Sequence, residues 1–162
     1  NIPDGLNDSK KLSQAARERL SAILLRDAVV SIGQASVAEI DEINILQASF
    51  LAMQRAVQGL SVRPDHLLID GNKKPKWAGA ATTCVVKGDA RSLSIAAASI
   101  VAKVARDEIM ESLAQQFPGY GWETNQGYPT KAHKEALQTL GVTPHHRRSY
   151  KPVHNILYQE QY

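Results

Sequence analysis

The chain has 162 residues, 43% hydrophobic and 22% charged, and these values are those of a soluble globular protein large enough for one domain with a core. Its net charge of +3 is modest, and its single cysteine excludes an internal disulfide and fits a reducing, cytoplasmic setting. No stretch approaches the ~18 apolar residues of a membrane helix, so we expect no membrane contact.

The first third of the chain predicts two helices around a short strand. A serine that can cap a helix opens residues 13–26, and residues 28–35 form a strand candidate. Ser36 and Glu39 have the spacing of a capping box, and they begin a helical stretch that Gly59 ends.

Two acidic residues each follow a short apolar run and precede a turn. Residues 67–70 predict a buried strand ending at Asp70, and residues 82–86 predict a second strand that leads to Asp89. Sites in open α/β sheets form at the carboxyl ends of strands, so the two carboxylates could share a divalent cation. Taken singly, either aspartate could instead cap a turn or the next helix.

The second half of the chain is predicted to be mainly helical. A long helix over 92–116 is stopped by Pro118-Gly119, and a loop rich in glycine and aromatic residues follows over 117–129. Residues 130–141 predict a last regular helix, and the tail over 144–162 is predicted to be irregular.

Basic residues cluster in three predicted loops, at residues 10–11, 73–76 and 145–148. Basic loops around a pair of acids indicate a polyanion held beside a metal site. Each cluster taken alone is equally typical of solvent-exposed charge.

Seven stretches in order resemble the bacterial type 2 ribonuclease H family, ribonuclease HII. They are residues 6–12 (LNDSKKL), 39–48 (EIDEINILQA), 69–72 (IDGN), 86–89 (VKGD), 94–107 (SIAAASIVAKVARD), 127–133 (GYPTKAH) and 146–150 (HRRSY). The stretches cover almost the whole chain, and together they are highly specific.

The resemblance implies an α/β fold of the ribonuclease H type, with a mixed sheet flanked by helices and a helical region near the C-terminus. It implies one domain over 1–162, with 118–162 as the region that contacts substrate. The family consists of cytoplasmic endonucleases that use Mg²⁺ or Mn²⁺. They act on RNA–DNA hybrids and on ribonucleotides embedded in duplex DNA, as in ribonucleotide excision. We expect a monomer when the chain is complete.

The resemblance also implies the residues of the metal site. Asp70 and Asp89 match the two later catalytic aspartates of the family, and Asp107 matches a family acid near the site with a less certain role. His133 and His146 could be taken for metal ligands, but the chain has no third His or Cys at ligand spacing, which favours structural roles.

Four residues are expected to contact the nucleic acid. Tyr128 matches the tyrosine that packs on the ribonucleotide at the RNA–DNA junction, and Lys10 matches a phosphate-facing lysine. Phosphates on either side would meet Lys131 and Arg147 as well.

The chain departs from the family at its beginning. The family's first strand carries Asp-Glu-Ala-Gly-Arg-Gly, which supplies two metal ligands and a backbone sensor of the ribose 2′-hydroxyl. The Asp-Glu pairs of this chain, at 41–42 and 107–108, do not precede Gly-Arg-Gly, and we reject Asp41-Glu42 as a replacement because it falls at a predicted helix start. We therefore interpret the sequence as a family member whose first strands are missing.

Three functions remain open at this point. The first is a metal-dependent ribonuclease, and the second is a non-catalytic nucleic-acid-binding fragment, because half of the family's metal site is absent. The third is a phosphatase with Asp70 as nucleophile, but that chemistry usually needs a second aspartate where Asn72 stands.

Overall fold

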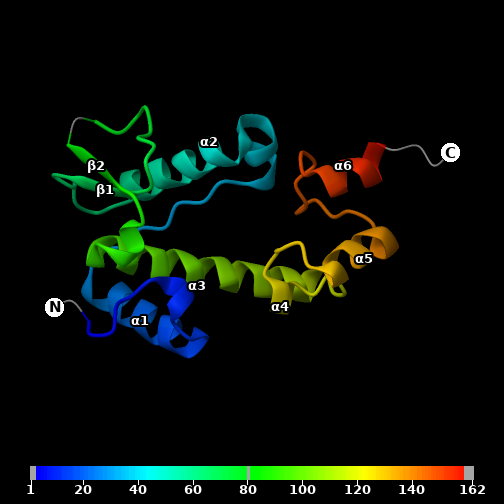
Figure 1. Cartoon of the computed structure of the whole chain (residues 1–162), viewed down its shortest axis with the longest axis horizontal. Helices are drawn as coiled ribbons and strands as arrows, with labels where there is room; N and C mark the ends of the chain where they lie inside the picture. The colour runs from blue at the N-terminus through cyan, green and yellow to red at the C-terminus, as the bar shows by residue number, and fades with distance from the viewer. Residues whose placement is uncertain (1–2, 80, 159–162) are drawn as a thin grey trace. The chain divides into compact units, whose positions relative to one another are not determined.

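A computed structural model describes residues 3–79 and 81–158 of the chain. Its contacts divide the chain into two compact units, Asn1–Gln34 with Phe50–Ala105 and Ala35–Ser49 with Arg106–Tyr162. Two long helices, α2 (Val37–Gln58) and α3 (Leu93–Gln116), contribute residues to both units (Figure 1). The expectation of a single domain over 1–162 stays a prediction.

The first unit contains a pair of parallel strands, which confirms the two predicted strand positions. Apart from α2, the elements before α3 are η1 (Ser9–Lys11), α1 (Gln14–Asp27), β1 (Leu67–Asp70), β2 (Thr82–Val85) and η2 (Gly88–Ala90). Leu67 pairs with Thr82 and Asp70 pairs with Val85, so both strands end at the same edge. Figure 1 shows β1 and β2 side by side.

The predicted helix starts are confirmed by their capping hydrogen bonds. The Ser13 hydroxyl accepts from the Ala16 amide at 3.3 Å, which opens α1. In the capping box, the Glu39 amide donates to the Ser36 hydroxyl at 3.2 Å, and the Ser36 amide donates to the Glu39 carboxylate at 2.8 Å. These bonds satisfy amide groups that a helix N-terminus leaves unpaired.

The strand predicted over 28–35 is wrong, because the structure gives this segment no strand. The segment packs on the backbone of α2 instead of pairing in a sheet. A Cβ added at Gly33 would overlap the Ala52 carbonyl oxygen and lie 2.5 Å from the Ala56 nitrogen. Arg55 also donates to the Gln34 carbonyl at 2.7 Å. Close contact with a helix therefore replaces the expected strand ladder.

Helix α2 is kinked at Asn44, which the sequence pattern did not predict. Asn44 has φ 68° and ψ 163°, outside helical geometry. Its side-chain oxygen accepts from the amides of Leu46 at 3.1 Å and Gln47 at 3.2 Å. Asparagine therefore acts as a cap inside the helix and starts its second part.

The core of the first unit lies between helices and β1. Its buried apolar residues come from α1, β1 and the first half of α3: Leu20, Leu24, Ile69, Ile95, Ala96, Ile100 and Val101. The small residues of α3 permit close approach, and the hydroxyls of Ser9 and Ser99 lie 2.8 Å apart, which ties η1 to α3. This packing fixes the element that carries Lys10.

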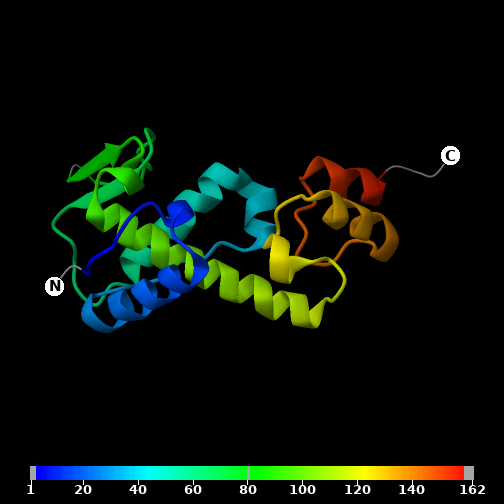
Figure 2. The same ribbon diagram turned by 60° about the horizontal axis from the view of Figure 1, so that its bottom comes forward.

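The described part of the second unit has a helix where an irregular tail was predicted, and residues 159–162 of that tail lie outside the described residues. Its shorter helices are α4 (Trp122–Asn125), α5 (Lys131–Leu140) and α6 (Lys151–Tyr158). The prediction of an irregular tail is wrong for α6 because Val153 is buried against Leu137, which gives the amphipathic segment a surface to fold on. Figures 1 and 2 both show α5 and α6 as neighbours.

Aromatic and apolar side chains form the core of the second unit. The buried residues are Met110, Ala114, Tyr120, Trp122, Leu137 and Val153. Among the residues that the structure describes, no helix is long and apolar enough to cross a membrane.

Candidate functional site

The carboxylate of Asp70 is held at the edge where both strands end. Asp70 is the last residue of β1, and its Oδ1 accepts a hydrogen bond from the Gly88 amide at 2.7 Å. The Gly71 amide donates to the Val85 carbonyl at 2.9 Å, so the chain leaves β1 still attached to β2. The side chain itself is exposed. Asp70 is therefore fixed in place and open to solvent.

Asp89 lies one residue beyond the amide that binds Asp70. It belongs to η2, which follows β2 through Lys87 in the left-handed conformation at φ 53°. The amides of Arg91 and Ser92 both donate to the Gly88 carbonyl, at 3.0 and 2.8 Å, and lead the chain into α3. Asp89 therefore directly follows the residue whose amide holds the Asp70 carboxylate at the end of β1.

Gly88 is the residue that allows this approach. A Cβ at this position would lie 2.5 Å from Ile95 Cδ1 and 3.2 Å from Asp70 Oδ1. Side chains larger than hydrogen would therefore push on the core and on the carboxylate together. In the sequence Gly88 is only part of the VKGD motif, and no local pattern indicates this contact.

The two aspartates fit a hard divalent cation in their chemistry. Mg²⁺ and Mn²⁺ prefer oxygen ligands, and Mg²⁺ commonly binds one or two carboxylates with water and phosphate. Within residues 3–79 and 81–158, no three His, Cys, Asp or Glu side chains are grouped so that they could hold a metal ion. A cation held by these two carboxylates would take most of its coordination positions from water and substrate.

Asp107 belongs to the second unit, whereas Asp70 and Asp89 belong to the first. It lies on α3 and has an interaction of its own within the described structure. Its assignment as a metal ligand stays a prediction.

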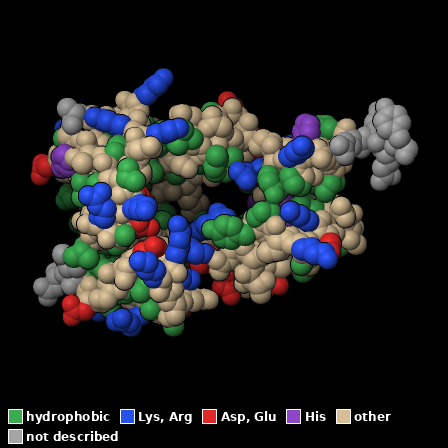
Figure 3. All heavy atoms as spheres, in the orientation of Figure 1, with side chains coloured by type: hydrophobic (Ala, Val, Ile, Leu, Met, Phe, Trp, Pro, Cys, Tyr) green, Lys and Arg blue, Asp and Glu red, His purple; other side chains and the backbone are tan. Residues whose placement is uncertain are grey.

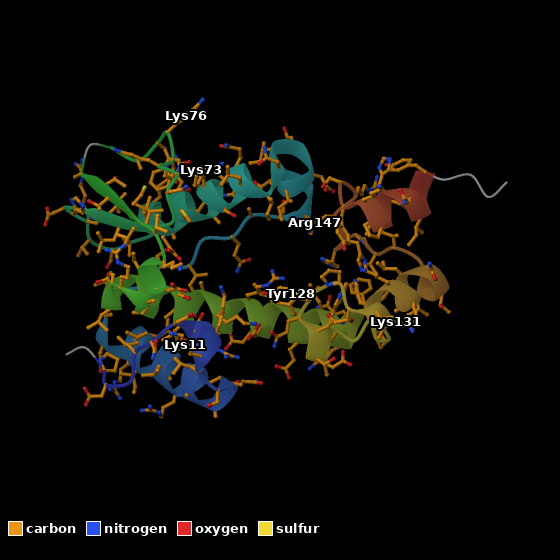
Figure 4. All side chains as sticks on the ribbon, in the orientation of Figure 1. Lys11, Lys73, Lys76, Tyr128, Lys131 and Arg147 are labelled. Carbon is orange, nitrogen blue, oxygen red and sulfur yellow. The ribbon has the colours of Figure 1, made fainter. Side chains whose placement is uncertain are left out.

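The predicted phosphate contact Lys10 lies in η1 of the first unit. The Asp8 side chain caps this turn by accepting from the Lys10 amide at 2.9 Å, and the lysine side chain is exposed. Lys73 and Lys76 are exposed in the loop after β1, and Figure 4 shows Lys76 extending away from the ribbon. The visible face of the first unit therefore carries several cations (Figure 3).

Tyr128 lies on a hydrogen-bonded turn in the second unit. Tyr128 is 60% exposed, while its amide donates to the Asn125 carbonyl at 2.8 Å. The Asn125 side chain accepts from the Gly127 amide, also at 2.8 Å. Arg106 on α3 donates to the Gln126 carbonyl at 3.1 Å. Arg106 is thus a support for this turn that the sequence analysis did not single out.

Lys131 and Arg147 are the other predicted nucleic-acid contacts of the second unit. Lys131 is the first residue of α5 after the Thr130 cap, and its Nζ lies 3.8 Å from Glu135 in an exposed pair. Arg147 is half-buried, with its guanidinium 5.5 Å from the centre of the Tyr150 ring. Figure 4 labels both side chains. No contact joins them directly within the part of the unit that the structure describes.

His133 and His146 are core residues, as favoured from the sequence. Both rings are buried, and they stack on each other with centroids 5.3 Å apart. His133 Nδ1 lies 3.0 Å from the Tyr120 carbonyl oxygen. Tyr120 and Trp122 each approach the His146 ring at 5.0 Å. The two histidines therefore support the aromatic core.

A family model described as Ribonuclease HII matches residues 4–153. The chain is 66% identical to the Ribonuclease HII of Ruegeria pomeroyi over 98% of this chain and 68% of that protein. It is also 66% identical to that of Cereibacter sphaeroides, over 98% of this chain and 75% of the relative.

A solved structure agrees with the sequence matches. The ribonuclease H2 from Pyrococcus horikoshii OT3 superposes with a TM-score of 0.77 at 28% identity, over 96% of this chain and 81% of that chain. The likeness confirms the predicted α/β fold of the ribonuclease H type.

Proposed function

Because the chain belongs to the ribonuclease HII family, we propose that it hydrolyses the RNA strand of RNA–DNA hybrids and ribonucleotides embedded in duplex DNA. The observation that supports this most directly is the contact that connects Asp70, at the end of β1, to the turn that contains Asp89. Asp70 is fixed by the Gly88 amide at 2.7 Å, and Asp89 follows that glycine.

We assign Asp70 and Asp89 as the catalytic residues and as ligands of Mg²⁺ or Mn²⁺. In a two-metal mechanism such ions activate a water and stabilise the leaving oxygen of a phosphodiester. In this assignment Asp70 and Asp89 supply negatively charged oxygen atoms at the carboxyl end of the strands. The hydrogen bond from Gly88 restricts the rotation of the Asp70 carboxylate and leaves its exposed side open to substrate. Asp107 is a further candidate ligand.

We assign nucleic-acid contacts to Lys10 in the first unit and to Tyr128, Lys131 and Arg147 in the second. Tyr128 offers an exposed ring on a fixed turn, and stacking of a base or sugar on an aromatic ring contributes about 1–3 kcal/mol. Lys10, Lys131 and Arg147 supply positive charge for phosphates. Selection of RNA depends on the 2′-hydroxyl, which is the group that DNA lacks.

A second candidate is a non-catalytic nucleic-acid-binding protein. It is favoured by one observation: the described residues hold no group of three potential metal ligands. Both candidates require duplex binding through the basic and aromatic residues, and they differ only in hydrolysis.

Cleavage of a duplex with one ribonucleotide, assayed with Mg²⁺ and with Mn²⁺, tests the proposal. Asp70→Asn keeps the shape of the side chain but removes its charge. We expect it to lower turnover by more than the roughly 10–100-fold that follows loss of a group supporting a metal ligand. Asp65→Asn, an exposed aspartate of the same unit, is the matched control and should be unchanged.

The outcomes separate the two candidates. Binding of the duplex without metal-dependent cleavage by the unaltered chain would favour the non-catalytic protein. Near-normal turnover of Asp70→Asn in saturating Mg²⁺ would show that Asp70 is only a turn residue.

A further inference from the structure

Asp41 makes contacts that its position in the sequence does not explain. It lies in the first part of α2, yet its Oδ2 accepts from the Arg148 amide at 2.8 Å and its Oδ1 accepts from the Ser149 amide at 3.0 Å. The Ser149 hydroxyl donates to the same Oδ1 at 2.5 Å. Both carboxylate oxygens are therefore engaged by a segment more than 100 residues away in the chain.

The electrostatics of this contact favour the ionised carboxylate. Partial burial opposes the charge, but the hydrogen bonds from Ser149 and Arg148 and the nearby Arg147 guanidinium outweigh it. Together they lower the pKa of Asp41 below its ordinary value. Hydrogen bonds to a charged acceptor are about twice as strong as neutral ones, so the contact is a firm attachment.

The attached segment is the loop over 143–150, which contains the predicted basic cluster 145–148 and the predicted phosphate contact Arg147. Within this loop, His146 is buried in the aromatic core. The Tyr150 amide donates to the Arg147 carbonyl at 3.1 Å, and the Tyr150 ring lies under the Arg147 guanidinium. Between His146 and Tyr150, Asp41 holds the loop through hydrogen bonds from the amides of Arg148 and Ser149.

We propose that Asp41 is a positioning residue for nucleic-acid binding, which acts by holding the backbone at Arg148 and Ser149 so that Arg147 is set to contact a duplex phosphate. The inference rests on the proposed function, and it assigns a role to an acid that would otherwise oppose a polyanion. A carboxylate beside a phosphate-binding arginine repels the ligand. Asp41 offsets this repulsion by holding the loop in place through its hydrogen bonds.

A purely structural role for Asp41 is the competing explanation. Its carboxylate lies near the N-terminal end of α6, where a negative charge also stabilises a helix by about 0.3–1 kcal/mol. The two roles differ in whether the effect on binding depends on Arg147, and a double-mutant cycle measures that dependence.

The test compares Asp41→Ala, Asp41→Asn, Arg147→Ala and the double variant Asp41→Ala/Arg147→Ala. Binding and cleavage of a duplex with one ribonucleotide are measured across salt concentrations, after circular dichroism has shown that each variant is folded. Glu42→Gln is the matched control, because Glu42 is the exposed neighbouring acid. Asp41→Asn keeps one acceptor oxygen and covers the case in which the alanine variant does not fold.

We expect Asp41→Ala to weaken binding about three- to tenfold and to reduce the salt slope by about 0.9, the value of one phosphate contact. KM should rise while kcat at saturating duplex stays unchanged, since the aspartates of the first unit are untouched. Asp41→Asn should fall between wild type and Asp41→Ala. In the Arg147→Ala background, loss of Asp41 should have no further effect on binding.

Two results would overturn the inference. One is an unchanged salt slope and KM in folded Asp41→Ala or Asp41→Asn, provided that the wild-type chain binds and cleaves the duplex. The other is a loss in the Arg147→Ala background equal to that in wild type, which would assign Asp41 to stability alone. If the unaltered chain neither binds nor cleaves the duplex, the proposed function fails, and this inference fails with it.

Discussion

The ring of His146 is held in the folded protein as a neutral group. It is only 7% exposed, and the Thr143 amide donates to its Nδ1 at 3.1 Å, so this nitrogen must be an acceptor. Burial, followed by the charge that His133 can carry, lowers the pKa of His146 to about 4 and outweighs the smaller, opposite effect of the hydrogen bond with Thr143. Acidification should therefore destabilise the folded chain.

The size of the effect follows from the two pKa values. The unfolded chain has the ordinary value of 6.5, so between pH 6.5 and about 4 it binds a proton that the folded chain does not. Stability is lost as the pH falls through this window, at about 1.4 kcal/mol per pH unit. From about pH 7.5 to about pH 5 the loss due to His146 is about 2 kcal/mol.

Urea unfolding of the full chain at several pH values measures this loss. His146→Asn removes the titrating ring, and it should flatten the pH dependence while lowering stability at neutral pH. His145→Asn is the matched control, because His145 is exposed and adjacent. It should keep the wild-type slope. The comparison between variants removes the contribution of carboxylates, which all three chains share.

The reasoning would be refuted by either of two results. The first is a wild-type free energy of unfolding that does not change between about pH 7.5 and pH 5. The second is a His146→Asn variant whose stability falls with the same slope as that of wild type, because another group would then bind the proton.

Three further predictions concern the site and its supports. Gly88→Ala should lower the free energy of unfolding in urea by about 1–3 kcal/mol, because its Cβ would press on Ile95. It should also reduce cleavage by displacing Asp70, and unchanged turnover would contradict the tight fit. Tyr128→Ala should weaken discrimination between ribonucleotide-containing duplex and plain DNA more than it weakens duplex binding itself. Lys10→Ala should lower duplex affinity and reduce the slope of log binding constant against log salt concentration by about one. Identical profiles for the two variants would refute this division of roles. Thr130→Ala removes the cap of α5 and should lower the free energy of unfolding by about 1 kcal/mol in the same measurement. An unchanged stability would show that the 3.2 Å hydrogen bond from the His133 amide does not stabilise the helix.

Features that depend on neighbouring residues were predictable from the sequence. The caps at Ser13, Ser36 and Thr130 each join atoms three residues apart, so their geometry is contained in the local pattern. The two strand positions before Asp70 and Asp89 were predictable for a similar reason, since an apolar run followed by a turn is a local signal. The family resemblance came from motifs of this kind.

Features that depend on a distant partner were not predictable. Residues 28–35 have the composition of a strand, but Gly33 lies against the α2 backbone. The tail after Tyr150 has weak helix signals, but Val153 finds a buried position in the core of the second unit.

Asp41 gives the clearest contrast between the two levels. The sequence placed it at a helix start, where acids are common, and the structure adds three hydrogen bonds from residues 148 and 149. The sequence by itself determined the family, the positions of the candidate ligands and the local caps. The tertiary structure decided which distant backbone groups meet them, because such contacts depend on how the chain packs and not on the spacing of residues along it.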